Sequence, residues 1–171
     1  MKKMISISIL LLLSSSCTSI DYHRTISPAQ IKAMVKSLEN ATNSRDVSTV
    51  MSHFSSSATI HVQYPGHVDR EDVIFDKTSY EENLTEAFKI SDKLFYECKI
   101  DSLSMSEDSR TAAVVLTEYQ TQISESYGVT SSFRGIQTMS IEIINGKPQI
   151  SKVVMKVQDM VTKPIENRSS H

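Results

Sequence analysis

Residues 131–159 read SSFRGIQTMSIEIINGKPQISKVVMKVQD, and their pattern predicts two long β-strands joined by a tight turn. Apart from Gln137, every second residue of the first half is apolar or glycine, which is the period of a strand with one face against a core. This face carries Phe133, Gly135, Gln137, Met139, Ile141 and Ile143. Asn145-Gly146 supplies the two positive-φ residues of a type I′ turn. The sequence therefore predicts a hairpin of strands 131–144 and 149–159.

A third strand, expected at 111–123, precedes the hairpin and is rich in Thr, Val and Tyr, which favour strands. Three antiparallel strands with one apolar face need a covering layer, and the earlier part of the chain should provide it. Ser27, Pro28 and Gln30 form the pattern of a capped helix start. A second helix should begin near Asp46, and a third should begin with a capping box at Thr78.

Shorter strands are expected between and after these helices. They are placed at 58–64, 73–75 and 93–100, with a break at 55–57 and a β-bulge near Ser102. In the strand at 93–100, Cys98 falls on the same face as Leu94 and Ile100, so we expect a buried thiol without a reactive or metal-binding role. After Met160 the chain is mostly polar, and a frayed tail is expected at 161–171.

The first residues have the order of a bacterial lipoprotein signal. Lys2 and Lys3 precede an apolar run that is too short to span a bilayer, and three serines lead to Cys17. We expect cleavage after residue 16 and lipidation of Cys17, followed by a tether at 17–26. The pattern departs from the usual one because Ser14, rather than a leucine, stands three residues before the cysteine. An ordinary secretory signal with a chance cysteine is the alternative.

Size and charge narrow the class of protein. The chain has 171 residues, which suits one domain with a real core. Its net charge is −2, and removing Lys2 and Lys3 with the leader leaves 16 basic and 20 acidic residues, or −4. No basic patch dominates, so a nucleic-acid partner is disfavoured.

The segment Asn43-Ser44-Arg45-Asp46, followed by Phe54 and by Ser57-Ala58-Thr59-Ile60, resembles the nuclear-transport-factor-2-like superfamily, which includes SnoaL-like and ketosteroid-isomerase-like proteins. In those proteins a turn with Asp starts the second helix, a Phe ends it, and an Ala-Thr-hydrophobic strand follows. The resemblance covers about 27–160. It implies an α+β fold, a cystatin-like roll in which a curved, mostly antiparallel sheet and three helices form a cone with a pocket. A homodimer through the open sheet face is also implied.

The resemblance also implies where catalytic residues would stand. The isomerase-like members carry a carboxylate base on the first strand and a tyrosine on the first helix; counting from Phe54 gives Val62 and Leu38. Neither side chain transfers a proton, so the cone is expected to lack an acid–base pair. The expected pocket lining is Leu38, Ile60, Val62, Tyr64, Tyr119, Gln137 and Met139. For Gln137 a side chain satisfied by backbone or water is the simpler explanation, and the alternative for Tyr64 and Tyr119 is that they are core aromatics with bonded hydroxyls.

Other chemistry finds little support in the sequence. His61, His67 and three nearby acids match no metal-ligand spacing, and solvated loop charges explain them better. There is no phosphate-binding glycine loop and no nucleophile elbow. We therefore expect no metal, cofactor or catalytic residue.

The leading expectation is an exported, lipid-anchored protein of the cell envelope, on the periplasmic face of the outer membrane in a Gram-negative cell. Its non-catalytic domain would bind a small apolar ligand or an envelope protein. Two alternatives stay open: an isomerase- or dehydratase-like enzyme, and a structural subunit of a secretion-type envelope assembly.

Overall fold

A computed structural model describes residues 25–165. The order of elements is α1 (Pro28–Asn43), α2 (Val47–Ser52), β1 (Phe54–Gln63), β2 (Val73–Asp76), α3 (Lys77–Lys89), β3 (Lys93–Met105), β4 (Thr111–Ser124), the short 3₁₀ helix η1 (Glu125–Tyr127), β5 (Val129–Ile144) and β6 (Lys147–Pro164). The predicted α+β class and its three α-helices are confirmed. The predicted leader, Cys17 and most of the tether lie outside the described residues.

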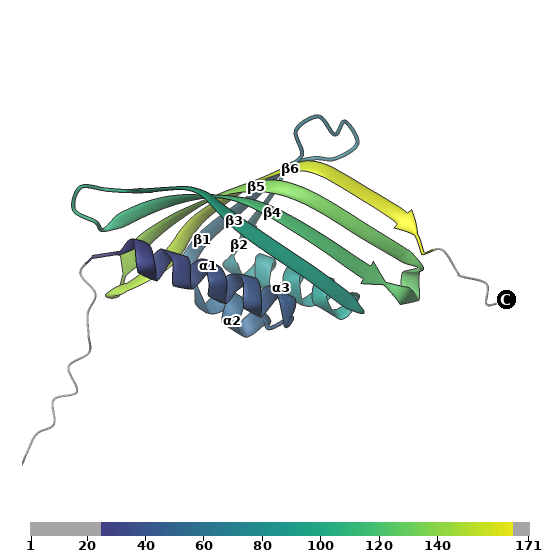
Figure 1. The fold of residues 1–171 in the computed structure, drawn as a ribbon, viewed down its shortest axis with the longest axis horizontal. Coiled ribbons are helices and arrows are strands. Elements are labelled where there is room, and N and C mark those ends of the chain that lie inside the picture. Colours follow the sequence, from purple (N-terminus) through teal and green to yellow (C-terminus); the bar gives the residue numbers. More distant parts are fainter. Residues whose placement is uncertain (1–24, 166–171) are drawn as a thin grey trace, which may run out of the picture.

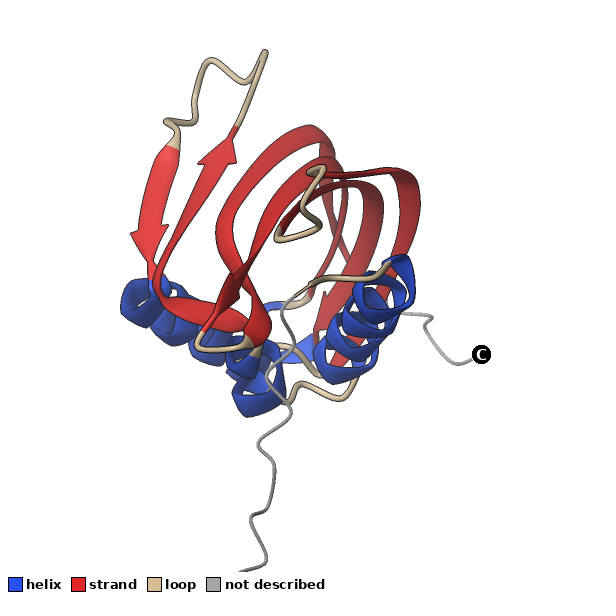
Figure 2. Ribbon diagram, turned by 90° about the vertical axis from the view of Figure 1, so that its left-hand side faces the viewer, coloured by secondary structure: helices blue, strands red, loops and turns tan. Residues whose placement is uncertain are grey.

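The six strands form one sheet in the order β2-β1-β6-β5-β4-β3. All neighbours are antiparallel except β1 and β6, which run parallel. The sheet is strongly curved, and the three helices lie on its concave side (Figure 1). The end view in Figure 2 shows the strands curling around towards the helices, so that sheet and helices together enclose a cone.

Local sequence signals explain most boundaries. The Ser27 side chain accepts a hydrogen bond from the Gln30 backbone, and Gln30 bonds back to Ser27, so the predicted capping box begins α1. Asp46 caps α2 as expected. Asn145 and Gly146 both have positive φ and turn the chain between β5 and β6. The predicted bulge is confirmed by a register shift between Ile100 and Ser102.

Several boundaries differ from the prediction. Asp76, rather than Thr78, caps α3, because its carboxylate accepts the Ser79 backbone N–H. The serines at 55–57 belong to β1, where a register shift before Thr59 accommodates them. The frayed tail was predicted to begin at residue 161, but β6 continues to Pro164 through its ladder with β5.

The predicted tether also ends differently. Ile26 is 3% exposed, and its N–H donates to the Ser109 carbonyl at 2.6 Å, so the domain starts before α1. Among residues 25–165, no helix is long and apolar enough to cross a membrane.

The core fills the narrow part of the cone, between α1, α2 and the concave face of the sheet. Its fully buried side chains come from every layer, namely Ile31, Ile60, Val114, Leu116, Met139, Ile141, Ile150 and Val153. Cys98 is partly buried and packs against this core, as expected from its place in β3. The wider part of the cone, beside α3, is less completely filled, and the cavity lies there.

Candidate functional site

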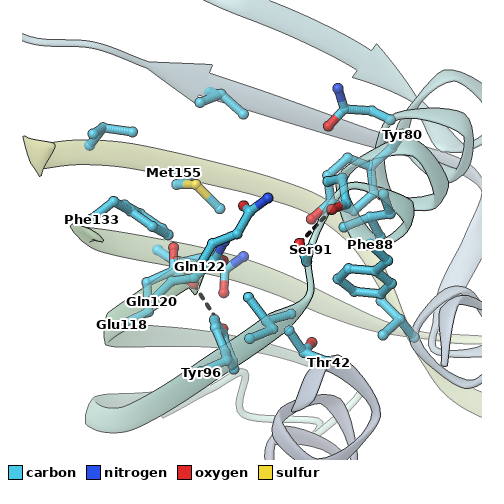
Figure 3. A pocket seen from close by; sticks show the side chains of 18 of the residues that line it. Thr42, Tyr80, Phe88, Ser91, Tyr96, Glu118, Gln120, Gln122, Phe133 and Met155 are labelled. Atoms are coloured by element: carbon cyan, nitrogen blue, oxygen red, sulfur yellow. Dashed lines mark hydrogen bonds between the residues drawn. The ribbon is translucent and has the colours of Figure 1, made fainter. Parts of the chain in front are cut away.

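A cavity of about 330 Å³ lies between α3 and the concave face of the sheet. This is at the small end of the range of ligand pockets, roughly 300–1,000 Å³. One wall consists of α3 residues, including Tyr80, Leu84 and Phe88, and the other of side chains from all six strands. Thr42 of α1 and Val50 of α2 also reach it. Figure 3 shows Tyr80 and Phe88 on one side, with Phe133, Met155 and the residues of β4 facing them.

A buried carboxyl group is the main chemical feature of this cavity. Glu118 of β4 is only 1% exposed and lines the cavity. The Tyr96 hydroxyl of β3 donates a hydrogen bond of 2.8 Å to Glu118 Oε2, as Figure 3 shows. The other oxygen, Oε1, is buried without a hydrogen-bond partner among the described residues. A buried polar atom without a hydrogen-bond partner is rare in proteins.

The surroundings change the acidity of these groups. Burial raises the pKa of Glu118 to about 7, although the hydrogen bond from Tyr96 acts in the opposite direction. The pKa of Tyr96 is raised well above its ordinary value, first by burial and then by the charge of Glu118. Burial also raises the pKa of Tyr80, with a smaller contribution from Glu118. Both phenols therefore stay protonated near neutral pH, where Glu118 titrates.

Neighbouring residues position Tyr96 and Glu118. Asn43, the last residue of α1, bonds to both the backbone N–H and the carbonyl of Tyr96, at 2.8 and 2.7 Å. Gly135 of β5 is the direct cross-strand partner of Glu118. A Cβ added at Gly135 would lie 3.4 Å from Glu118 Oε1 and 3.2 Å from the Lys156 carbonyl. A side chain at Gly135 would therefore touch the carboxyl group at an ordinary distance and crowd the Lys156 carbonyl.

Polar side chains extend from Glu118 along the cavity. Gln120 and Gln122 follow it on the same face of β4, and Gln137 lies on β5. Gln137 is 8% exposed and is the one polar residue on the predicted inward face of β5. Ser91, which follows α3, also lines the cavity, but its hydroxyl donates to the Ala87 carbonyl at 2.6 Å.

The predicted pocket residues divide into two groups. Val62, Tyr64 and Gln137 line the cavity. Leu38, Ile60 and Met139 do not: Ile60 and Met139 are 0% and 1% exposed in the core, and Leu38 packs against it. These three were misplaced because side chains of α1 and α2 pack against the sheet over most of their length, and the cavity reaches these helices only at Thr42 and Val50.

The assignment of Tyr119 to the cavity was wrong. Its side chain is 47% exposed on the opposite face of the sheet, with the Arg134 guanidinium 5.6 Å from its ring centroid. The inward face of β4 carries the even-numbered residues, beginning with Ala112, Val114 and Leu116. Continuing that alternation past Leu116 would have identified Glu118.

The expectation of a cone without an acid–base pair was also wrong. It depended on two positions, Leu38 and Val62, that carry no ionisable group. The carboxyl and phenol groups instead come from β4 and β3, at Glu118 and Tyr96, with Tyr80 of α3 close by. These three residues are the functional candidates that the sequence reasoning missed.

The loop with the histidines and acids is organised around Asp72. Its carboxylate accepts the Tyr64 backbone N–H at 3.1 Å and lies 3.2 Å from His61 Nε2. The Arg70 guanidinium lies 5.5 Å from the centre of the Tyr64 ring. Asp72 and His61 therefore have a structural role, because their contacts hold the loop between β1 and β2 closed.

Comparison with known proteins supports the fold. No protein-family model matches the chain, and no curated protein matches its sequence. Among solved structures, a ketosteroid isomerase-like protein from Erwinia carotovora atroseptica matches with a TM-score of 0.58 and 16% identity, over 77% of this chain and 95% of that chain. The hexachlorocyclohexane dehydrochlorinase LinA-type3 from Novosphingobium barchaimii matches with a TM-score of 0.60 and 9% identity, over 84% and 91%.

A domain of unknown function with a cystatin-like fold, from Nostoc punctiforme, matches with a TM-score of 0.59 and 11% identity, over 77% of this chain and 76% of that chain. Sequence identities this low support a shared fold and not a shared activity. The six-stranded curved sheet, the three helices and these neighbours together show that the chain has a cystatin-like α+β fold, as the sequence resemblance implied.

Proposed function

We propose that the domain binds one small, largely apolar molecule in the cavity beside α3 and holds it through Glu118. The observation that carries this proposal is the buried carboxyl group with one unpartnered oxygen, set in an otherwise mostly apolar wall. Ligand sites commonly combine an apolar lining with a few placed polar groups. An unpartnered buried oxygen is costly in the free protein, and a bound donor would remove that cost.

Blocking the cavity tests this proposal. Ala87 lines the cavity from α3, whereas Thr85 on the same helix is exposed. Ala87→Phe should abolish binding of the neutral fluorescent probe N-phenyl-1-naphthylamine, and Thr85→Phe, which adds a similar side chain outside the cavity, should leave it unchanged. Probe binding that is equal in both variants and the wild type would show that the cavity is not the site.

A second candidate is a proton-transfer enzyme of the isomerase or dehydratase type. The specific observation that favours it is a carboxyl group with a pKa of about 7, hydrogen-bonded to a phenol inside a cavity. A group that titrates near the working pH can both accept and return a proton. Two structural neighbours are named as a ketosteroid isomerase-like protein and a dehydrochlorinase, so the same fold is found in proteins with such names.

This candidate can be tested without knowing the substrate. The protein is incubated with a panel of small cyclic ketones in D₂O, and deuterium entering next to the carbonyl is followed by NMR. Catalysis should depend on Glu118 and be lost in Glu118→Gln, while the exposed control Glu97→Gln retains it. Exchange at the same rate in Glu118→Gln, or none above background with any ketone, would favour binding alone.

We also propose that the mature protein is held at a bacterial membrane by lipid on Cys17. What supports this is the order of basic residues, apolar run, serines and cysteine at the start of the chain. A tether would then separate the anchor from the folded domain.

A further inference from the structure

We infer that the molecule bound in the cavity is a small organic cation, an aromatic or alicyclic ammonium compound whose charged N–H group pairs with Glu118. This inference rests on the proposed function, since it specifies the chemistry of the ligand at the same site. Three features of the cavity lead to it: the charge of its lining, the aromatic side chains around it, and the hydrogen-bonding state of Glu118.

The described residues that line the cavity can carry negative charge but no positive charge. Of the described residues around the cavity, none is lysine, arginine or histidine, and Glu118 is the one carboxyl group. An ionised Glu118 therefore has no counter-charge from the described part of the chain. A carboxylate ligand would meet only like charge there, whereas a cation would supply the missing partner. In a site that excludes water, such a pair interacts more strongly than it would at the surface.

Aromatic side chains form much of the remaining wall. Six of them line the cavity: Tyr64, Phe75, Tyr80, Phe88, Tyr96 and Phe133. Aromatic rings attract cations through the negative potential of their faces, and proteins recognise ammonium groups with clusters of such rings. The same rings accommodate the apolar body of the ligand. A carboxylate beside several aromatic rings thus suits an ammonium group attached to a hydrocarbon.

The hydrogen bonds of Glu118 leave one acceptor free. Tyr96 donates to Oε2, while Oε1 has no donor among the described residues. An ammonium group in the cavity would supply both the charge and the donor that the ionised carboxyl group lacks, and hydrogen bonds between charged groups are roughly twice as strong as those between neutral groups. A neutral alcohol could occupy the same position, but it would gain neither the charge interaction nor the attraction to the rings.

The pH dependence of binding should report Glu118 alone. The ionisable side chains around it are Tyr96 and Cys98 of β3 and Tyr80 of α3, and Glu39 of α1 lies beyond Cys98 at 3.6 Å from its sulfur. Both phenols and the thiol have raised pKa values and remain neutral through neutral pH. From β5, the residue opposite Glu118 is Gly135, which does not ionise.

Three ligands of similar size and different charge test the inference on the intact domain: benzylamine, benzyl alcohol and benzoate. At about pH 8, where Glu118 is ionised, benzylamine should bind at least about tenfold more tightly than benzyl alcohol, measured by NMR titration. Benzoate should not bind detectably. The affinity for benzylamine should rise about tenfold or more between about pH 5 and pH 8 as Glu118 loses its proton.

Glu118→Gln should lower the affinity for benzylamine to about that for benzyl alcohol, while Glu97→Gln, at an exposed position on β3, should keep the wild-type preference for the amine. The inference is overturned if benzyl alcohol binds as well as benzylamine to the wild type, or if the preference survives in Glu118→Gln. If none of the three ligands binds, and N-phenyl-1-naphthylamine is also not excluded by Ala87→Phe, the proposed function itself fails. Binding of the neutral probe without a preference for the amine would reject only the cation.

Discussion

Glu118 and Gly135 face each other across the β4–β5 ladder, and a Cβ at Gly135 would lie in contact with the carboxyl group, 3.4 Å from Oε1. A Cβ there would lie 3.0 Å from the Phe133 ring and 3.2 Å from the Lys156 carbonyl. The ring edge can move, but the backbone carbonyl cannot move without disturbing the pairing with β6. Close contact, and not backbone conformation, therefore favours glycine at position 135, since the φ angle of Gly135 is not in the positive range.

Gly135→Ala should destabilise the protein by roughly 1–3 kcal/mol, the usual cost of overpacking a filled site. Urea unfolding followed by circular dichroism measures this change. Thr138→Ala, at an exposed position on the same strand, should change the free energy of unfolding by no more than about 0.5 kcal/mol. Equal effects of the two substitutions would show that the space around Gly135 is not tightly filled.

The stability of the protein should depend on the protonation of Glu118. Its pKa is about 7 in the folded protein against an ordinary 4.5, so between these values the folded state keeps a proton that the unfolded state has lost. Stability contributed by this group is then present at about pH 4.5 and falls as pH rises to about 7, by about 3 kcal/mol in total.

Glu118→Gln cannot ionise and should flatten this dependence. Its melting temperature should exceed that of the wild type at about pH 8 and be similar at about pH 4.5. Glu97→Gln, at an exposed position on β3, should follow the wild-type curve. Parallel curves for wild type and Glu118→Gln would mean that Glu118 titrates like an exposed carboxyl group.

The start of α3 offers a matched pair of substitutions. Asp76 accepts the Ser79 N–H at 2.8 Å, whereas Thr78 is exposed in the first turn. Asp76→Ala should therefore cost about 1 kcal/mol, and Thr78→Ala should cost about 0.5 kcal/mol or less. Chemical denaturation of the two variants and the wild type measures both losses of stability. A larger loss of stability for Thr78→Ala than for Asp76→Ala would indicate that Thr78 is the capping residue.

The thiol of Cys98 should be unreactive in the folded protein. Burial, followed by the nearby charge of Glu39, raises its pKa to about 12, so little thiolate is present at neutral pH. Alkylation by a maleimide should be slow in buffer and fast in denaturant, as measured by mass spectrometry of the peptide that contains residue 98. Glu39→Gln should increase the folded-state rate. Fast alkylation of the native wild type would contradict the buried position.

The anchor proposal is tested by Cys17→Ala. Without a cysteine to acylate, the full-length chain should move from the membrane fraction to the soluble fraction after cell disruption. Cys98→Ala serves as a control and should remain membrane-associated. A Cys17→Ala protein that stays with the membranes would argue for a different mode of attachment.

The sequence predicted β5 better than β4, for a physical reason. On β5 the inward residues are apolar or glycine except at Gln137, so alternation identifies the buried face. On β4 the inward face changes from Val114 and Leu116 to Glu118 and Gln120, while Tyr119 faces outward. Functional cavities place polar groups where a core would place apolar ones, and this breaks the pattern on which the prediction depends.

Two of the three helix starts were predicted correctly, since capping depends on nearby residues, while at α3 the cap is Asp76 and not Thr78. Ser27 and Asp46 were identified correctly from their immediate neighbours. The size of the cavity was not predictable, because it depends on how α1 and α3 cover different parts of the sheet. Leu38 of α1 and Tyr80 of α3 both lie on the apolar face of their helix and pack against the core, but of the two only Tyr80 lines the cavity.

The parallel pairing of β1 with β6 has a consequence for folding kinetics. It joins residues such as Ile60 and Val153, which lie 93 positions apart in the chain. Such high contact order slows folding, because a long loop must close before the contacts form. A chain truncated before Lys147 would leave β1 and β2 with no strand to connect them to the rest of the sheet, so β6, near the end of the polypeptide, must be available before the cone can close.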